Sequence, residues 1–287
     1  YHKYKNTIIN QLKMLCEICK NKLTKFEKIS KVNLMKCKIC EHTITDIKVN
    51  SKYYKETYSD HYVDERGKNW MNNPNIELFQ KIYDFIKEKN KGRIIDLGCG
   101  VGLFCKFLIS KNKNLDITGV DLIKNKKFKN IKFINKEFFK YKTIKKYKFV
   151  ISIAVIEHVP KVKKYFDYLK KISSKNSYFI ILTINTNSIL YFIANFLFKI
   201  GIKTPFIRLY DTHHLNHFSK KSLNKFIYKN KFKIVRRIDT PISMKQIDYP
   251  YNNVFTKYFL YTALYIILKI EKIFNMSWLQ TVIFKKN

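Results

Sequence analysis

Three glycines at alternate positions, Gly98, Gly100 and Gly102, form the stretch of this chain best suited to hold a ligand. Because a glycine lacks a Cβ atom, the backbone N–H groups of such a loop can approach a bound molecule closely. A dinucleotide-binding loop requires another glycine three positions after the second, where this chain has Leu103. The Asp-x-Gly-x-Gly-x-Gly spacing, which begins at Asp96, therefore predicts a different nucleoside ligand.

A second acidic residue extends this predicted site. Asp121 ends the apolar segment 115–121, which predicts the next strand along the chain. In a doubly wound sheet, ligands bind beyond the carboxyl ends of the strands, and an acid at the end of the second strand can accept hydrogen bonds from both ribose hydroxyls. Asp96, the glycines and Asp121 together therefore predict a nucleoside-binding site.

Four of the six cysteines form two Cys-x-x-Cys pairs, Cys16 with Cys19 and Cys37 with Cys40. The spacing of the pairs is typical of a zinc ion held by four thiolates. Since four protein ligands leave no coordination position for a substrate, we expect this Zn²⁺ to be structural and to hold residues 1–46 as a zinc ribbon. Such a metal site, in place of a disulfide framework, favours a reducing cytoplasm.

Histidines supply the residues that could move a proton. His213, His214 and His217 follow Asp211 closely, and Ser219 is expected to cap the helix after them. A neutral imidazole can accept a proton from a reacting hydroxyl group. We expect no metal at this cluster, because no cysteine or further acid stands at ligand spacing.

The elements that must position these residues follow from the apolar pattern. An amphipathic helix is predicted over residues 75–90, and another follows the glycine loop. Strands are predicted at residues 93–97, 115–121, 130–135, 147–152, 177–184, 232–238 and 279–284. This alternation predicts an α/β fold, a Rossmann-like, seven-stranded doubly wound sheet with an N-terminal zinc ribbon and helical insertions.

The chain is expected to divide into three parts. The zinc ribbon at 1–46 is followed by a Tyr-rich connector with a cap helix at 47–90 and by the α/β domain at 91–287, with helical insertions near 187–212 and 249–277. In the connector, tyrosines recur at near-helical spacing and could either lean over the ligand pocket or pack against the main domain. These tyrosines are Tyr53, Tyr54, Tyr58 and Tyr62.

Two segments carry a resemblance to a known family. The loop from Asp96 to Gly102 resembles motif I of class I S-adenosylmethionine-dependent methyltransferases, and residues 156–160, Ile-Glu-His-Val-Pro, resemble a segment of small-molecule and quinone-type members. The resemblance covers residues 91–287 and implies S-adenosyl-L-methionine as methyl donor. The residues it implies for donor binding are Asp96, Gly98, Cys99, Gly100, Gly102, Asp121, Leu122, Glu137, Phe138 and Ala154. Some quinone-type relatives bind a divalent metal with an acid at the position of Ala154, so no catalytic metal is expected here.

The combination of ribbon, connector and domain looks like bacterial methyltransferases of surface-polysaccharide or sugar-modification clusters. This resemblance implies a small-molecule acceptor, a sugar or glycan precursor methylated on oxygen. As general base we expect His158 first and His214 or His217 second, with Asp211 as an orienting carboxylate.

The charge leaves a second class of substrate open. A formal net charge of +36 would suit an RNA methyltransferase. However, nearly all of this charge is lysine, whereas specific recognition of bases and phosphates favours the arginine fork. Uniform lysine bias is what an AT-rich coding sequence gives, so we do not expect nucleic acid as the partner.

Two apolar segments leave a third class open. Residues 189–198 and 258–268 are too short to cross a bilayer, and lysines flank both. They could pack together as a substrate lid, or they could bind an anionic membrane surface as in a lipid or quinone methyltransferase at the inner membrane. A non-enzymatic zinc adaptor would fit only if the loop with Asp121 bound no donor.

Overall fold

The computed structural model describes residues 14–49, 68–89, 92–248 and 253–286. A seven-stranded sheet runs through its centre in the order β10-β11-β8-β7-β4-β5-β6. Its strands are β4 (Ile94–Leu97), β5 (Ile117–Asp121), β6 (Ile131–Asn135), β7 (Tyr147–Ile153), β8 (Ser173–Ile184), β10 (Phe232–Ile238) and β11 (Leu279–Lys286). Strands β4 to β8 pair in parallel, and β11 pairs antiparallel with β8 and β10. The predicted Rossmann-like fold is confirmed. The tyrosines of the connector lie outside the described residues.

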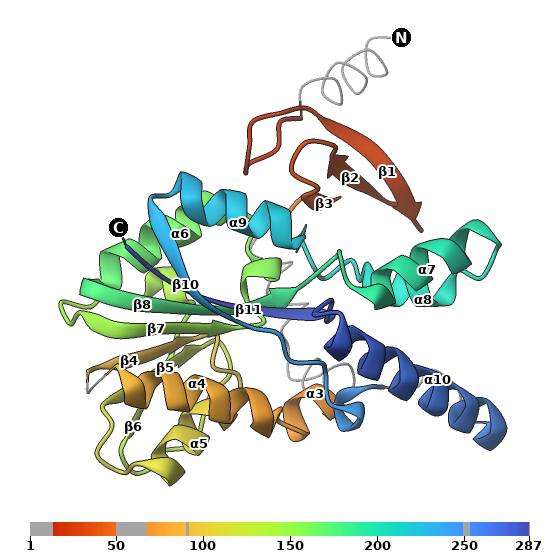
Figure 1. The fold of residues 1–287 in the computed structure, drawn as a ribbon. Coiled ribbons are helices and arrows are strands. Elements are labelled where there is room, and N and C mark those ends of the chain that lie inside the picture. Colours follow the sequence, from red (N-terminus) through yellow and green to blue (C-terminus); the bar gives the residue numbers. More distant parts are fainter. Residues whose placement is uncertain (1–13, 50–67, 90–91, 249–252, 287) are drawn as a thin grey trace.

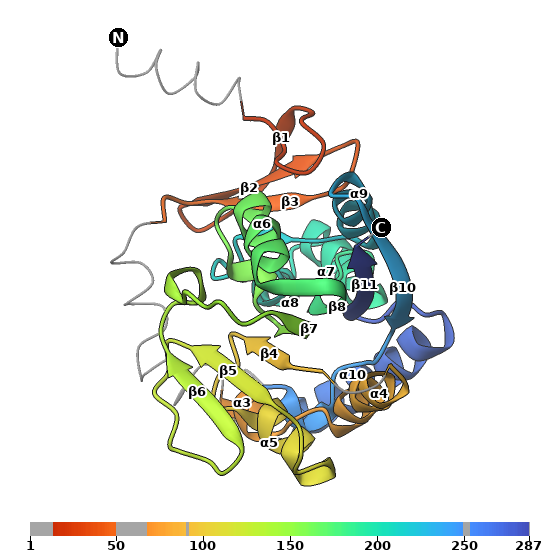
Figure 2. The same cartoon turned by 90° about the vertical axis from the view of Figure 1, so that its left-hand side faces the viewer.

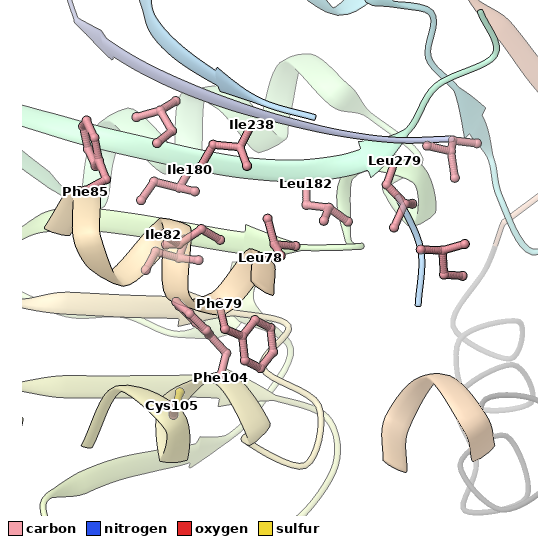
Figure 3. Close-up of a cluster of buried hydrophobic side chains, with 14 of the residues drawn as sticks. Leu78, Phe79, Ile82, Phe85, Phe104, Cys105, Ile180, Leu182, Ile238 and Leu279 are labelled. Carbon is pink, nitrogen blue, oxygen red and sulfur yellow. The ribbon is translucent and has the colours of Figure 1, made fainter. Parts of the chain in front are cut away.

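Helices cover both faces of the sheet (Figure 1). On one face lie α4 (Ile76–Glu88) and α5 (Leu103–Lys111), and on the other lie α6 (Val162–Ile172) and α9 (Lys220–Lys229). Leu78, Ile82 and Phe85 on α4 are spaced so that they share one side of the helix, and all three are buried. Figure 3 shows this side packed against Ile180 and Leu182 of β8.

The ribbon forms a second, antiparallel sheet. It contains β1 (Leu23–Ile29), β2 (Val32–Cys37) and β3 (Thr43–Asp46), and its fourth strand is β9 (Asn216–His217), which comes from the α/β domain. In Figure 2 the ribbon lies beyond α6 and α9, on the side of the main sheet away from α4 and α5.

The predicted insertions are helical. The first contains α7 (Ile189–Lys199) and α8 (Thr204–Leu209), and the second contains α10 (Val254–Ile273). The turn η4 (Met244–Gln246) precedes the second. Helix α7 packs against both α8 and α10. Within the described ranges, no helix combines the length and the apolar character needed to cross a membrane.

Candidate functional site

The glycine loop lies between the end of β4 and the start of α5. Gly98 has φ of +70°, and a Cβ built on it would lie 2.4 Å from Cγ2 of Val155. Gly100 has φ of +54°, a backbone angle that residues with a side chain rarely adopt. Gly102 is the N-cap residue of α5, so the loop leads directly into the positive end of a helix. The structure thus explains why glycines occupy these positions.

Asp121 lies at the carboxyl end of β5, beside this loop. Its Oδ2 accepts a hydrogen bond from the N–H of Gly100 at 2.8 Å, and its Oδ1 accepts one from the N–H of Ile123 at 2.8 Å. Each carboxylate oxygen has a second lone pair and can accept another bond. Asn125, which sequence reasoning did not select, donates from Nδ2 to the carbonyl of Gly100 at 2.7 Å. Both residues therefore fix the conformation of the loop.

A cavity opens beside the loop. The predicted residues Asp96, Gly98, Cys99 and Gly100 line it. Burial, together with the nearby charge of Asp121, raises the pKa of Asp96 to about 7. The Oδ2 of Asp96 accepts from the Cys105 thiol at 3.5 Å, whereas its Oδ1 is buried without a hydrogen-bond partner among the described residues. Because buried polar atoms are nearly always paired, this oxygen suits a ligand that brings a donor.

Part of the cavity wall comes from elements that sequence reasoning did not connect with the site. Trp70 and Met71 lie on α3 (Lys68–Asn72), and Gln246 lies on η4. The two elements are in contact, and Asn69 of α3 donates from Nδ2 to Oδ1 of Asp248, two residues after η4, at 2.5 Å. No local pattern marks these residues, because they meet only through the fold.

The other residues implied for donor binding do not line the cavity. Two of them, Gly102 and Asp121, belong to the glycine loop or are bonded to it. Leu122 is exposed, Glu137 pairs with Lys140 at 3.2 Å, and Phe138 packs against neighbouring aromatic rings. Ala154 follows β7 with φ of +55°. Their proposed contacts with a donor remain predictions.

A second cavity lies at the opposite edge of the sheet. Arg93, Asp116 and Lys148 are among its lining residues, near the amino ends of the strands. The three long cations that line it already have partners. Arg93 pairs with Asp116, Lys148 donates to the carbonyl of Lys89, and Lys146 donates to that of Lys171. Ligands of doubly wound sheets bind at the carboxyl edge, so this cavity is not the candidate site.

Glu157, His158 and His214 meet beyond the carboxyl end of β7. Their ligand atoms all lie within 4.8 Å of one another. Glu157 is buried and accepts a hydrogen bond from the Thr183 hydroxyl at 2.9 Å, and burial raises its pKa to about 7. We expected no further acid at ligand spacing from these histidines. This expectation is wrong, because the fold brings Glu157 within reach of His158 and His214.

The protonation of His158 follows from its partner. The carbonyl of His213 lies 3.0 Å from Nδ1 of His158 and can only accept, so Nδ1 carries the hydrogen and Nε2 is the basic nitrogen. Burial lowers the pKa of His158 to about 3 and that of His214 to about 4, so both rings are neutral at pH 7. Both can therefore accept a proton.

The other two predicted catalytic residues have different partners. Asp211 binds Nδ1 of His213 at 2.7 Å and the N–H of the same residue at 3.0 Å, so the histidine it orients is His213. His217 is fully buried, and its Nε2 lies 3.0 Å from the hydroxyl of Thr45 in the ribbon. His217 therefore lies at the interface between the ribbon and the domain.

The ribbon contacts this cluster closely. Besides the pairing of β3 with β9, the Thr45 hydroxyl donates to the carbonyl of His214 at 2.5 Å. Glu17 caps the start of α6, because its two oxygens accept from the N–H groups of Val162 at 3.0 Å and Lys163 at 3.1 Å. The ribbon thus positions both segments that carry the histidines.

Cys16, Cys19, Cys37 and Cys40 converge in the ribbon. Their Sγ atoms all lie within 4.8 Å of one another, with Cys16 to Cys40 at 3.5 Å and Cys19 to Cys37 at 3.4 Å. Tetrahedral zinc with Zn–S bonds near 2.3 Å separates its sulfur ligands by roughly 3.8 Å. The residues present therefore fit a zinc ion.

Together, the doubly wound sheet, the glycine loop and the acids at the ends of β4 and β5 define a nucleoside-binding α/β protein. Residues 68–236 match the model of a family described as "Methyltransferase domain". The chain belongs to this methyltransferase-domain family.

Curated relatives match the chain in part. It is 30% identical over 134 residues to malonyl-[acyl-carrier protein] O-methyltransferase 2 of Ilyobacter polytropus, which covers 42% of this chain and 48% of that protein. It is 29% identical over 163 residues to the mitochondrial ubiquinone biosynthesis O-methyltransferase of Dictyostelium discoideum, covering 49% and 50% respectively. The chain thus spans about half the length of the curated relatives it matches.

Solved structures share the fold. A 1,6-didemethyltoxoflavin-N1-methyltransferase from Burkholderia thailandensis, with bound 1,6-didemethyltoxoflavin and S-adenosylhomocysteine, is 9% identical with a TM-score of 0.56, over 92% of this chain and 99% of that one. A plantazolicin methyltransferase in complex with a pentazolic analogue and S-adenosylhomocysteine is 16% identical with a TM-score of 0.52, over 82% and 93%. At these identities the likeness concerns the fold alone.

Proposed function

We propose that this protein is an S-adenosyl-L-methionine-dependent methyltransferase that methylates a hydroxyl group of a small molecule, a sugar or glycan precursor. The observation that carries this proposal is the cavity at the glycine loop. There, a buried carboxylate oxygen of Asp96 has no partner among the described residues, and Asp121 lies at the next strand end. The membership of the methyltransferase-domain family supports the same reaction.

The donor supplies an activated methyl group, so the protein's main task is to hold the acceptor in line with it. Such positioning can lower a barrier by roughly 7 to 11 kcal/mol. The acceptor oxygen attacks the methyl carbon, the carbon–sulfur bond breaks, and the hydroxyl proton must leave. We assign the proton to Nε2 of His158, with the Nδ1 of His214 as the second candidate, since it is buried without a partner among the described residues.

The zinc ion would have a structural role in the ribbon. Four thiolates saturate a tetrahedral ion, so zinc would fix the ribbon and through it the segments of the histidine cluster. We further propose the division into ribbon 1–46, connector and cap helix 47–90, and methyltransferase domain 91–287. Cysteines that bind zinc instead of forming disulfides favour a cytoplasmic setting.

The acceptor class can be tested with a labelled donor. Purified protein is given S-adenosylmethionine carrying a labelled methyl group together with a whole-cell extract, and the nucleic acid, lipid, protein and small soluble fractions are then counted. Label in soluble sugars or nucleotide sugars supports the proposal. Label in lipid would favour a lipid or quinone-type enzyme. The exposed apolar side chains of α7 and α10 are consistent with that alternative. Label in RNA, or in no fraction, would overturn it.

Replacing His158 with alanine should lower turnover by about 100-fold to 10,000-fold, because the acceptor proton loses its base. Donor affinity should change by less than about twofold, since His158 does not line the cavity. Single-turnover rates and calorimetric titration measure the two quantities. A variant that retains full turnover would remove His158 from the mechanism.

Turnover should rise as pH increases through about 7, where Glu157 ionises. An anion beside His158 and His214 stabilises the imidazolium that forms when either ring takes the proton. In Glu157→Gln this limb of the pH profile should vanish. In Thr183→Val it should move to higher pH, because the lost hydrogen bond favours the ionised acid. An unchanged profile in both variants would contradict this role of Glu157.

A further inference from the structure

Helix α10 carries an apolar face that no described element covers. At about 100° per residue, positions 255, 259, 266 and 273 lie within roughly 40° of one another on the helix surface. They hold Phe255, Phe259, Ile266 and Ile273, each more than half exposed, with Phe255 at 86%. A folded protein rarely leaves such a continuous row of large apolar side chains in water, so the face indicates a binding surface.

Helix α7, which packs against α10, carries exposed apolar side chains of its own. Phe192, Phe196 and Ile200 follow one another by one turn, and each is more than half exposed. Both helices extend from the same end of the main sheet (Figure 1). They are fastened there by the buried Glu271, whose carboxylate accepts from the N–H of Leu190 at 3.1 Å and from that of Trp278 at 3.0 Å. The bases of α7 and α10 are therefore held together.

The charges of α7, α8 and α10 have one sign at the surface. The acidic residue in these helices is Glu271, which is buried. The exposed cations on or between them are Lys199, Lys203, Arg208, Lys257, Lys269 and Lys272. Lys269 lies about 40° from Phe255 around α10 and therefore borders the apolar row, whereas Lys257 lies on the opposite side and Lys272 is 4.0 Å from Glu77 of α4. An apolar row bordered by Lys269 is complementary to lipid chains beneath anionic headgroups.

We propose that the exposed face of α7 and α10 binds the surface of an anionic phospholipid bilayer, with the helices lying in the interface. A second copy of this chain fits less well, because the same cations would face one another. Single-stranded nucleic acid would use stacking aromatic rings, whereas Ile200, Ile266 and Ile273 offer no such ring. Peripheral binding would bring the cavity at the carboxyl edge of the sheet near the membrane, and it does not depend on which acceptor the enzyme uses.

Co-sedimentation of the full chain with vesicles tests the proposal. We expect the protein to bind phosphatidylcholine vesicles with about 30% phosphatidylglycerol at least about tenfold more tightly than pure phosphatidylcholine. The double variant Phe255→Ser/Phe259→Ser should lose about tenfold or more of that binding. Lys269→Glu, at the border of the apolar row, should weaken binding to anionic vesicles, and the loss should mimic part of that caused by about 0.5 M salt.

Ile144→Ser is the matched control. Ile144 is 96% exposed and lies in the loop that leads into the amino end of β7. This control should bind vesicles like the unchanged protein. All variants should keep the melting temperature and donor affinity of the parent, which separates membrane binding from the proposed activity. Equal binding by Phe255→Ser/Phe259→Ser, no preference for anionic vesicles, or a stable dimer that buries this face would each overturn the proposal.

Discussion

Asp121→Ala should weaken binding of S-adenosylmethionine by about 100-fold or more. The two hydrogen bonds that we propose from the ribose hydroxyls to the Asp121 carboxylate would contribute roughly 3 to 6 kcal/mol. The same substitution takes an acceptor away from the N–H groups of Gly100 and Ile123, so the glycine loop also loses its support. Calorimetric titration with the donor measures the effect.

Asp116→Ala is the appropriate control. Asp116 directly precedes the same strand at its amino end, is half exposed and pairs with Arg93. Its loss should leave donor affinity within about twofold, since a surface ion pair contributes about 0 to 1 kcal/mol. Tight donor binding by Asp121→Ala, within about threefold of the parent protein, would refute the proposed ribose contact.

The second large effect is expected from removing zinc. Cys37→Ser/Cys40→Ser should lower the melting temperature by about 10 °C or more, because structural zinc contributes apparent binding energies of about 10 to 16 kcal/mol to small metal domains. Turnover should fall more than about tenfold, because β9 loses its partner strand and His214 its contact with Thr45. Metal analysis measures the loss of zinc, and amide hydrogen exchange of residues 214–218 measures the loss of the pairing between β3 and β9.

A ribbon variant that keeps the thiolates shows whether zinc itself matters. Glu41→Gln removes the ion pair with Lys221, at 3.2 Å, and should retain zinc, stability and most of the turnover. Donor affinity should persist in the zinc-free protein, because none of the cavity-lining residues belongs to the ribbon. Full turnover without zinc would show that the ribbon does not position the histidines.

Much of the fold is predictable because apolar residues recur locally along its strands. The apolar segment that begins at Tyr147 predicts β7, and the segment 232–238 predicts β10 with the bounds that the structure shows. The glycine loop and Asp121 were predictable for a similar reason. Their spacing reflects a single strand, turn and helix, where backbone geometry decides which residue fits.

Other features depend on long-range contacts that no local pattern reveals. Strand β9 has only two residues, both polar, and is defined by its pairing with β3. A sequence pattern of apolar residues therefore cannot reveal it. Glu157 and His214 are far apart in the sequence, and their proximity requires the whole sheet. The Asp211 contact is local, but three histidines follow this acid within six residues, and their spacing alone does not tell that its partner is His213.

The strand shared between ribbon and domain has a consequence for folding. The first three strands of the ribbon sheet are made before its fourth strand, which lies 174 positions further along, as the contact of His42 with Asn216 shows. Contacts so distant in sequence form slowly, because a long loop must close before they can contribute. The thiolates can bind zinc first, whereas docking of the ribbon must wait until most of the chain has folded. The contacts of the ribbon that hold His214, the pairing of β3 with β9 and the Thr45 hydrogen bond, therefore form in one of the last steps of folding.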